Sequence, residues 1–159
     1  MKRLFATNRC DGAALILRLV LGVVMFAHGA QKVLGWFGGY GFSGTVNAFT
    51  TMMHIPLGLA VAAIAAEFLG GLGLILGLLT RLSALGIAVN MSVAVFLVHF
   101  QYGFFMNWFG NQKGEGFEYH ILAFGIAVAL LIKGGGLASV DGIIAGSACE
   151  GCEKGTSQG

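Results

Sequence analysis

Four long apolar segments alternate with short polar or aromatic stretches along the chain. They cover residues 12–34, 55–79, 82–100 and 117–132, and few charged residues interrupt them. A helix of about 20 mainly apolar residues spans a bilayer, so the first three segments are long enough, while the fourth must begin near Glu118 or thin the membrane locally. The pattern predicts four transmembrane helices, with Thr80 and Arg81 forming a tight turn between the second and the third.

Composition places the chain among membrane proteins. Of its 159 residues, 57% are hydrophobic and only 10% are charged, and the mean hydropathy is +0.84. Soluble domains carry about 25% charged residues, so a water-soluble domain is excluded. The net charge is +2 without a basic cluster, which excludes nucleic acid as a partner. The expected fold is an all-α, integral membrane four-helix bundle whose first partner is the lipid bilayer.

The basic residues of the connecting segments predict the orientation of the helices. Short cytoplasmic loops are enriched in lysine and arginine, and the side that carries both termini has six such residues against two on the other side. Both termini are therefore expected to be cytoplasmic, with residues 1–146 forming the membrane domain and residues 147–159 a polar, flexible tail. The basic residues on the side of the termini are Lys2, Arg3, Arg9, Arg81, Lys133 and Lys154, and those on the opposite side are Lys32 and Lys113.

Aromatic residues gather in the two segments that connect the helices on the outer side. Five lie between Trp36 and Phe49 and eight between Phe100 and Tyr119. Two interpretations are open: an interfacial belt at headgroup depth, or a lid that folds back over the helices and walls an apolar pocket. Under the lid interpretation, the expected binding residues are Trp36, Phe104, Phe105 and Trp108.

Glycines crowd the first two apolar segments. Gly22 and Gly29 lie seven residues apart in the first segment, and four more lie between Gly70 and Gly77 in the second. Helices in lipid gain no hydrophobic advantage from associating, so small residues that permit close van der Waals packing hold such a bundle together. This pattern predicts helix contacts rather than a ligand site.

Ionisable residues inside the apolar segments are the main functional signal. A charged side chain at membrane depth costs about 2.5 to 3.5 kcal/mol on insertion scales, so it needs an internal partner or a wet cavity. Arg18, His28 and Lys32 share one sector of the first helix, while Glu67 and Asn90 lie among small residues on the second and third. We expect a polar ladder in which Arg18 reaches Glu67 through Asn90 or water. The alternative is a set of buried ion pairs that only fix the helix register.

Three further polar residues, His99 and the pair Glu118 and His120, extend this ladder to its outer mouth. On a straight helix His99 projects about 180° from Asn90, which turns it toward another helix or the interface. Metal and haem sites are not predicted, because the histidines form no His-x-x-x-His or Glu-x-x-His pattern. The four histidines are His28, His54, His99 and His120.

The three cysteines carry little functional signal. Cys10, Cys149 and Cys152 are assigned to the cytoplasmic side, and the last two form a lone Cys-x-x-Cys in the polar tail. Zinc normally needs four ligands, and no strand and helix context points to a thioredoxin-like motif. We interpret this pair as an incidental part of the tail.

Several separate motifs resemble the DoxX family of small bacterial four-helix membrane proteins, over roughly residues 13–146. The resemblance implies an inner-membrane protein near quinone-linked respiration or sulfur oxidation, since relatives look like the DoxD subunit of thiosulfate:quinone oxidoreductase and others are linked to oxidative-stress complexes. The tail beyond residue 146 lies outside the family pattern. The matching residues are Arg18-Leu19-Val20-Leu21-Gly22, His28-Gly29-Ala30-Gln31-Lys32, Glu67-Phe68-Leu69-Gly70-Gly71, Thr80-Arg81-Leu82-Ser83-Ala84, Asn90-Met91, His99, Glu118-Tyr119 and Ser139-Val140-Asp141.

The leading hypothesis is a polar intramembrane pocket that binds a quinone or a small sulfur-containing substrate of an oxidoreductase system. Glu67 and His28 are the candidate catalytic residues, because both can exchange protons when their surroundings shift them. Quinone is expected as a substrate, with no covalently bound cofactor, so electrons must come from substrate thiols or a partner subunit. The expected substrate-binding residues are Arg18, Lys32, Asn90, His99, Glu118, Trp36, Phe104, Phe105 and Trp108.

Two other functions stay open beside this hypothesis. The same polar residues suit a non-enzymatic membrane subunit, in which they serve assembly, or a small-solute carrier, in which they serve conduction. A homo-oligomer is as compatible with the sequence as a complex with a partner subunit.

Overall fold

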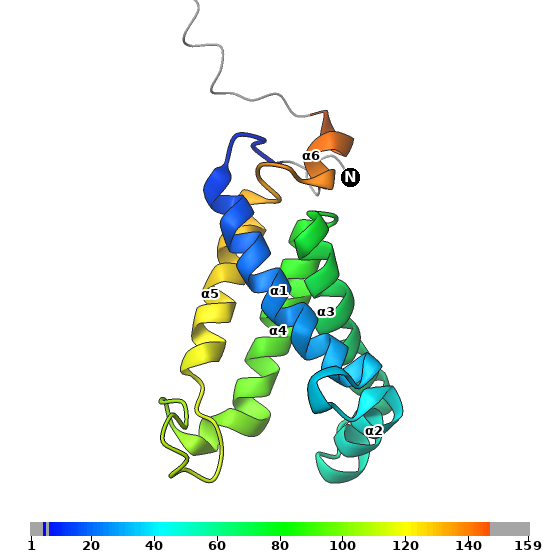
Figure 1. Ribbon diagram of the computed structural model, residues 1–159, viewed down its shortest axis with the longest axis vertical. Helices are drawn as coiled ribbons and strands as arrows, with labels where there is room; N and C mark the ends of the chain where they lie inside the picture. The colour runs from blue at the N-terminus through cyan, green and yellow to red at the C-terminus, as the bar shows by residue number, and fades with distance from the viewer. Residues whose placement is uncertain (1–4, 6, 147–159) are drawn as a thin grey trace, which may run out of the picture.

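The computed structural model describes residue 5 and residues 7–146, and every regular element in this part of the chain is helical. The prediction of an all-α fold is therefore confirmed for the described residues (Figure 1). The predicted tail, with Cys149 and Cys152, lies outside them. The helices are α1 (Gly12–Leu34), η1 (Trp36–Gly38), α2 (Gly41–Asn47), η2 (Ala48–Met52), α3 (Leu57–Leu76), α4 (Thr80–Ala94), η3 (Val95–His99), η4 (Phe100–Tyr102), α5 (Glu118–Lys133) and α6 (Val140–Ala145).

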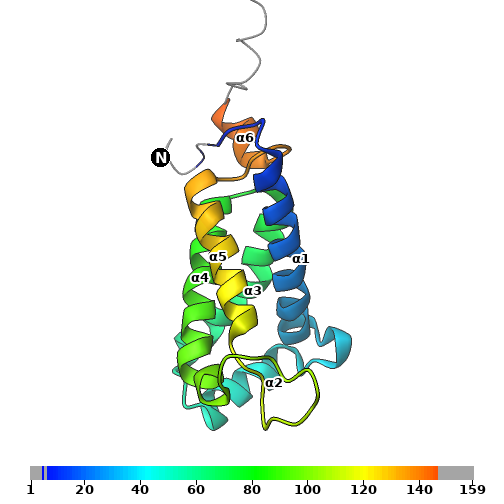
Figure 2. The ribbon, with the colours of Figure 1, turned by 90° about the vertical axis from the view of Figure 1, so that its left-hand side faces the viewer.

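Four helices, α1, α3, α4 and α5, run side by side along the long axis of the molecule (Figures 1 and 2). Helix α1 contacts α3 and α5, and α4 contacts α3 and α5, so each of the four has two neighbours. Helix α6 lies beside the start of α1 at one end, which we call the α6 end. The opposite end, the α2 end, carries α2 and residues 100–117.

Within the described residues, three helical stretches are long and apolar enough to cross a membrane, by length and composition: Gly12–Leu34, Leu57–Leu76 and Thr80–Tyr102. Helix α5 has 16 residues and is shorter than each of these three stretches. Large apolar side chains such as Val20, Leu59 and Leu122 point outward and are exposed. A soluble protein rarely shows so much contiguous apolar surface, whereas helices that face lipid require it.

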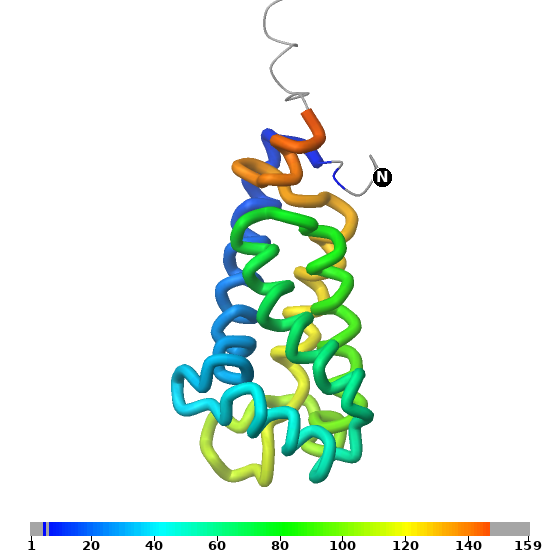
Figure 3. Tube along the Cα trace, turned by 90° about the vertical axis from the view of Figure 1, so that its right-hand side faces the viewer, coloured from blue at the N-terminus to red at the C-terminus, as the bar shows by residue number. Residues whose placement is uncertain are grey.

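The turn between α3 and α4 differs from the expected one. It lies at residues 77–79 rather than at Thr80 and Arg81, which form the first turn of α4 (Figure 3). Gly77 and Leu79 both adopt left-handed backbone conformations, with φ of 67° and 50°. The Asp141 carboxylate of α6 then accepts hydrogen bonds from Leu79 N at 2.7 Å and Thr80 N at 2.8 Å. This tertiary cap decides where α4 begins, because it satisfies two of the amides that an isolated helix start leaves unpaired.

Close packing of α1 on α3 confirms the role predicted for Gly22 and Gly29, whereas Gly77 ends α3 as its C-cap. A Cβ atom added to Gly29 would lie 2.5 Å from Phe68 Cα, and one added to Gly22 would lie 3.0 Å from Leu74 Cβ. Both distances are shorter than ordinary contacts, so only glycine permits this approach of the two backbones. The buried core beside this contact comprises Leu21, Met25, Leu74, Ala84, Ile87, Ala88, Met91, Ala123, Ala127 and Leu130.

At the α6 end, the segment before α1 is bonded to the end of α5. Lys133 Nζ donates to Asp11 Oδ2 at 2.6 Å, and Ala14 N donates to Asp11 Oδ1 at 2.9 Å, where Asp11 caps α1. These two hydrogen bonds, the first above all, hold the pKa of Asp11 below its ordinary value. The neighbouring Cys10 is disulfide-bonded.

Candidate functional site

A buried carboxylate on α3, Glu67, connects three helices. Lys32 of α1 forms an ion pair with Glu67 Oε2, and Asn90 Nδ2 of α4 donates to Glu67 Oε1 at 2.9 Å. Glu67 is 7% exposed, and both of its oxygens are used by these two partners. The structure thus brings together three of the residues predicted for the site. A buried carboxylate that is paired and hydrogen-bonded in this way avoids most of the penalty of lying at membrane depth.

Two side chains of α5, Tyr119 and His120, lie close to His28 and His99; His120 was expected only at the outer mouth, and Tyr119 was not among the expected site residues. The ring centroid of Tyr119 lies 6.2 Å from that of His28. His120 is 8% exposed and adjoins Tyr119 at 5.3 Å between ring centroids. The Tyr119 hydroxyl and His120 Nδ1 are buried and have no hydrogen-bond partner within the described residues. Buried polar atoms normally have partners, so these two atoms are free to bind a ligand or water.

His99 lies beside His120, toward the α2 end of the bundle. Its ring centroid lies 4.0 Å from that of His120, and its Nδ1 lies 2.8 Å from Glu115 O. The wide π-helical turn of η3, Val95–His99, follows the last α-helical residue of α4. A π turn contains more residues than an α turn and rotates the side chains that follow it. His99 therefore faces α5, where it contacts His120.

Arg18 lies outside this centre, so the predicted ladder from Arg18 to Glu67 is wrong. Its guanidinium is buried at the α6 end and donates to four backbone carbonyls: Leu74 and Ile75 at 3.1 and 3.0 Å, and Leu137 and Ala138 at 3.2 and 3.0 Å. The last carbonyls of a helix have no partner within it. Arg18 donates to two of those of α3 and ties them to the segment before α6, so its four terminal N–H groups are used at this end of the bundle, while its buried Nε has no partner among the described residues.

Glu118 holds the loop of residues 103–117 against the start of α5. Its Oε1 accepts from Met106 N at 3.2 Å and from Trp108 Nε1 at 3.0 Å. This carboxylate therefore already accepts hydrogen bonds from the loop, and a role of Glu118 in binding substrate stays a prediction. The loop is further closed by Asn107, whose side chain exchanges two hydrogen bonds with the backbone of Gln112 at 3.0 Å each.

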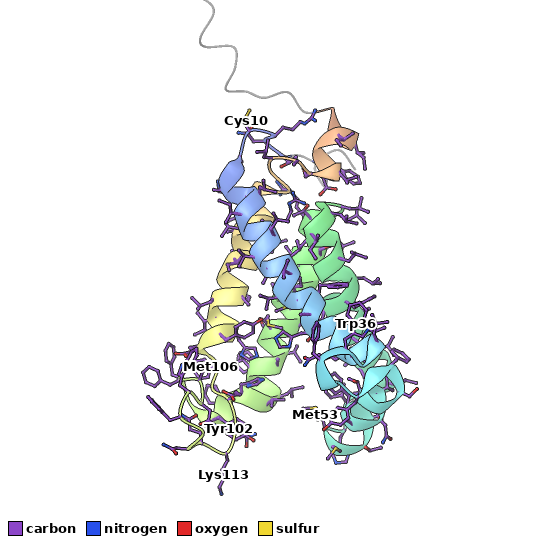
Figure 4. The ribbon with its side chains drawn as sticks, viewed as in Figure 1. Cys10, Trp36, Met53, Tyr102, Met106 and Lys113 are labelled. Atoms are coloured by element: carbon purple, nitrogen blue, oxygen red, sulfur yellow. The ribbon has the colours of Figure 1, made fainter. Side chains whose placement is uncertain are left out.

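The aromatic side chains predicted to form a lid do not all lie together: Phe104 and Phe105 are in contact, at 5.1 Å between ring centroids, but Trp36 lies apart from them (Figure 4). Trp36 lies with α2, whereas Met106 and Tyr102 lie on the other side of the α2 end (Figure 4). Trp36, Phe104, Phe105 and Trp108 are all exposed, and Trp108 is 78% exposed. Exposed aromatic rings at one end of membrane helices suit the interfacial belt, the alternative left open by the sequence.

Two cavities flank the α2 end of α1. The larger, of about 500 Å³, lies between α1 and the segment of residues 38–53, and we call it the Lys32 pocket. The smaller, of about 350 Å³, is lined by Val24, His28 and Phe37, and Gln31 lines both. None of the four aromatic residues predicted for the lid lines either cavity. In the described part of the chain, no group of three or more His, Cys, Asp or Glu side chains is placed to hold a metal ion.

Comparisons with known proteins agree with the motifs. The DoxX family model matches residues 13–100, a range that runs from α1 to η4 and contains Lys32, Glu67, Asn90 and His99. The chain is similar to the protein named "Putative oxidoreductase CatD" of Bacillus subtilis (strain 168), with 29% identity over 116 residues, which cover 73% of this chain and 76% of that protein. No solved structure matches the chain.

Proposed function

The chain belongs to the DoxX family, and on that premise we propose that it is a multi-pass inner-membrane protein of a quinone-linked oxidoreductase system. In this proposal α1, α3, α4 and α5 form a transmembrane four-helix bundle with both termini in the cytoplasm. The contacts of α5 with α1 and α4 support a fourth crossing. Its 16 residues span about 24 Å at helical rise, so the membrane thins slightly there.

The observation that carries the proposal is the Glu67 centre with free polar atoms beside it. Reduction of a quinone to a quinol takes up two electrons and two protons, so its site must supply protons in an apolar setting. Tyr119 of α5, beside His28, has a buried hydroxyl without a partner among the described residues. Lys32 carries the positive charge that an anionic quinone oxygen requires.

Proton transfer in this proposal runs through Glu67 and His28. Glu67 exchanges a proton with the bound ring, and His28, which lines the smaller cavity beside α1, relays protons at the α2 end. Tyr119 and His120 orient the ligand through their free polar atoms. The electrons come from a thiol or thiosulfate substrate or from a partner subunit. The name of the Bacillus subtilis relative supports the reaction class and says nothing of the substrate.

The purified chain in lipid nanodiscs tests the proposal by quinone reduction with thiosulfate or a thiol as donor. We expect Glu67→Gln to keep the fold and to lower the rate by about a hundredfold, the range of a lost general acid or base. Glu115→Gln is the matched control, because Glu115 is exposed in the loop of residues 103–117. Quinone reduction that Glu67→Gln leaves unchanged would overturn the role of Glu67.

The same preparation separates the alternatives. Activity that requires a co-purified protein identifies a subunit of a larger oxidoreductase. Solute flux into liposomes without any quinone reduction identifies a carrier and overturns the oxidoreductase proposal.

A further inference from the structure

The Lys32 pocket has apolar walls around a single cation. Phe49, Met52 and Met53 supply aromatic and thioether surface, and Ala48 adds a small apolar contact. Lys32 is the only charged residue among those that line the cavity. The volume of about 500 Å³ lies in the range of small-molecule sites, which combine apolar walls with a few polar groups.

Such a lining selects an apolar molecule that bears one anionic oxygen group. Methionine and aromatic side chains accommodate a flat or irregular apolar body, and the ammonium of Lys32 attracts the negative charge. The Thr45 hydroxyl, on a side chain only 5% exposed, adds a hydrogen-bonding group to the wall. The charges of a dication or a polyphosphate are not matched by this lining, in which Lys32 is the single charged residue.

Lys32 links the pocket to the Glu67 centre, because the same side chain lines the pocket and pairs with Glu67. In the structure its Nζ pairs with Glu67 Oε2. Its side chain is 25% exposed, whereas that of Glu67 is 9% exposed, so Lys32 has access to a ligand that Glu67 lacks. An anion in the pocket therefore competes with Glu67 for the same positive charge.

We propose that the Lys32 pocket binds an apolar carboxylate or phenolate, and that this binding draws the Lys32 ammonium from Glu67, which then takes up a proton from a buffer acid in the solvent. A buried carboxylate without its counter-charge is strongly unfavourable, and protonation removes that charge. The O–H bond of Glu67 forms as the buffer acid loses its proton and becomes its conjugate base, and no electron moves. The proposal deepens the proposed function, since it rests on Glu67 as the proton-exchanging group but does not need the redox reaction.

The surroundings of Glu67 make the proton uptake specific to this carboxylate. Among the described residues, its paired charge is Lys32 from α1, its other hydrogen-bond partner, Asn90 of α4, cannot change charge, and Tyr119 from α5 is a titratable group in its electrostatic surroundings. His28, His120 and His99 form the next group around the Tyr119 ring. Removing the Glu67 carboxyl therefore isolates its share of the proton uptake from that of the histidines.

Calorimetric titration of the chain in nanodiscs with 2-naphthoate tests the proposal, with neutral 2-naphthamide as the isosteric control and empty nanodiscs as the lipid control. We expect saturable binding of naphthoate, binding of naphthamide weaker by about tenfold or more, and net proton uptake measured in two buffers of different ionisation enthalpy. A parallel titration with pentafluorophenolate distinguishes a phenolate site from a carboxylate site. Equal binding of naphthoate and naphthamide, or absence of saturation, would overturn the pocket.

Three variants locate the site and the proton. Ala48→Phe fills the pocket without touching the ion pair and should abolish naphthoate binding, whereas Ala62→Phe, on an exposed position of α3, should leave it unchanged. Glu67→Gln should retain binding and lose the proton uptake. Naphthoate binding that survives Ala48→Phe, or proton uptake that survives Glu67→Gln, would overturn the proposal even if quinone reduction is observed. Failure of quinone reduction alone leaves these binding results, and hence the pocket, intact.

Discussion

Substitution of Gly29 by alanine tests whether close contact of α1 and α3 sets the geometry of the site. The added Cβ would lie 2.5 Å from both the N and Cα atoms of Phe68, whereas ordinary van der Waals contact begins at 3.4 Å. The clash is with backbone, which cannot rotate away as a flexible side chain can. The two helices must therefore separate locally by about 0.9 Å, and overpacking of this kind destabilises by about 1 to 3 kcal/mol.

The same displacement reaches the Glu67 centre. Phe68 follows Glu67 directly in α3, and Lys32 lies one helical turn after Gly29 in α1. Separation of the helices at Gly29 therefore lengthens the path from the Lys32 ammonium to the Glu67 carboxylate. We expect the Gly29→Ala variant to lose stability and, in addition, to bind naphthoate with less proton uptake, because its ion pair is already weakened.

Two other glycines serve as matched controls for an unfolding titration in mixed micelles, followed by circular dichroism. A Cβ at Gly70 meets Ile87 at an ordinary 3.5 Å, and one at Gly125 meets nothing within 4 Å. Gly125→Ala should stabilise by about 0.5 to 1 kcal/mol through helix propensity, and Gly70→Ala should change little. If Gly29→Ala were as stable as Gly125→Ala, the close packing inferred for α1 and α3 would be refuted.

Three further predictions concern the α6 end and the orientation. Arg18→Met should lower the free energy of unfolding by about 2 to 5 kcal/mol, because buried carbonyls lose their donor, yet leave naphthoate binding unchanged; a binding loss would return Arg18 to the site. Because the pKa of Asp11 is lowered in the folded state, its bond to Lys133 stabilises the fold above the ordinary pKa of 3.8 and ceases to do so as the pH falls through the lower pKa of the folded state. The difference in melting temperature between the unaltered chain and Asp11→Asn should therefore vanish as the pH is lowered through this range. Reporter fusions at Arg81 should read cytoplasmic and those at Gly44 external; the reverse result would invert the topology and place the disulfide-bonded Cys10 in an oxidising compartment.

The two buried charges, Arg18 and Glu67, show why sequence alone paired them wrongly. Both lie within apolar helices, so the cost of burial predicts that each needs a partner, and each has one. The partner of Arg18 is a set of carbonyls, two of which come from residues 119 and 120 positions away in the chain. Carbonyl acceptors occur at every residue and leave no sequence signal, whereas Lys32 is a recognisable counter-charge for Glu67.

The apolar helices, their order and the presence of close helix contacts at glycines follow from the sequence, because hydrophobic length and glycine spacing act locally and report directly on burial. The association of Glu67 with Asn90 also follows, since both are costly in lipid without a partner, but the structure makes Lys32 and not Arg18 the counter-charge of Glu67. The tertiary structure decided the remainder. The π turn of η3 brings His99 to His120, and Asp141 fixes the start of α4. The folding back of residues 38–53 beside α1 forms the Lys32 pocket. These features depend on contacts between segments distant in the chain, and no local periodicity encodes such contacts.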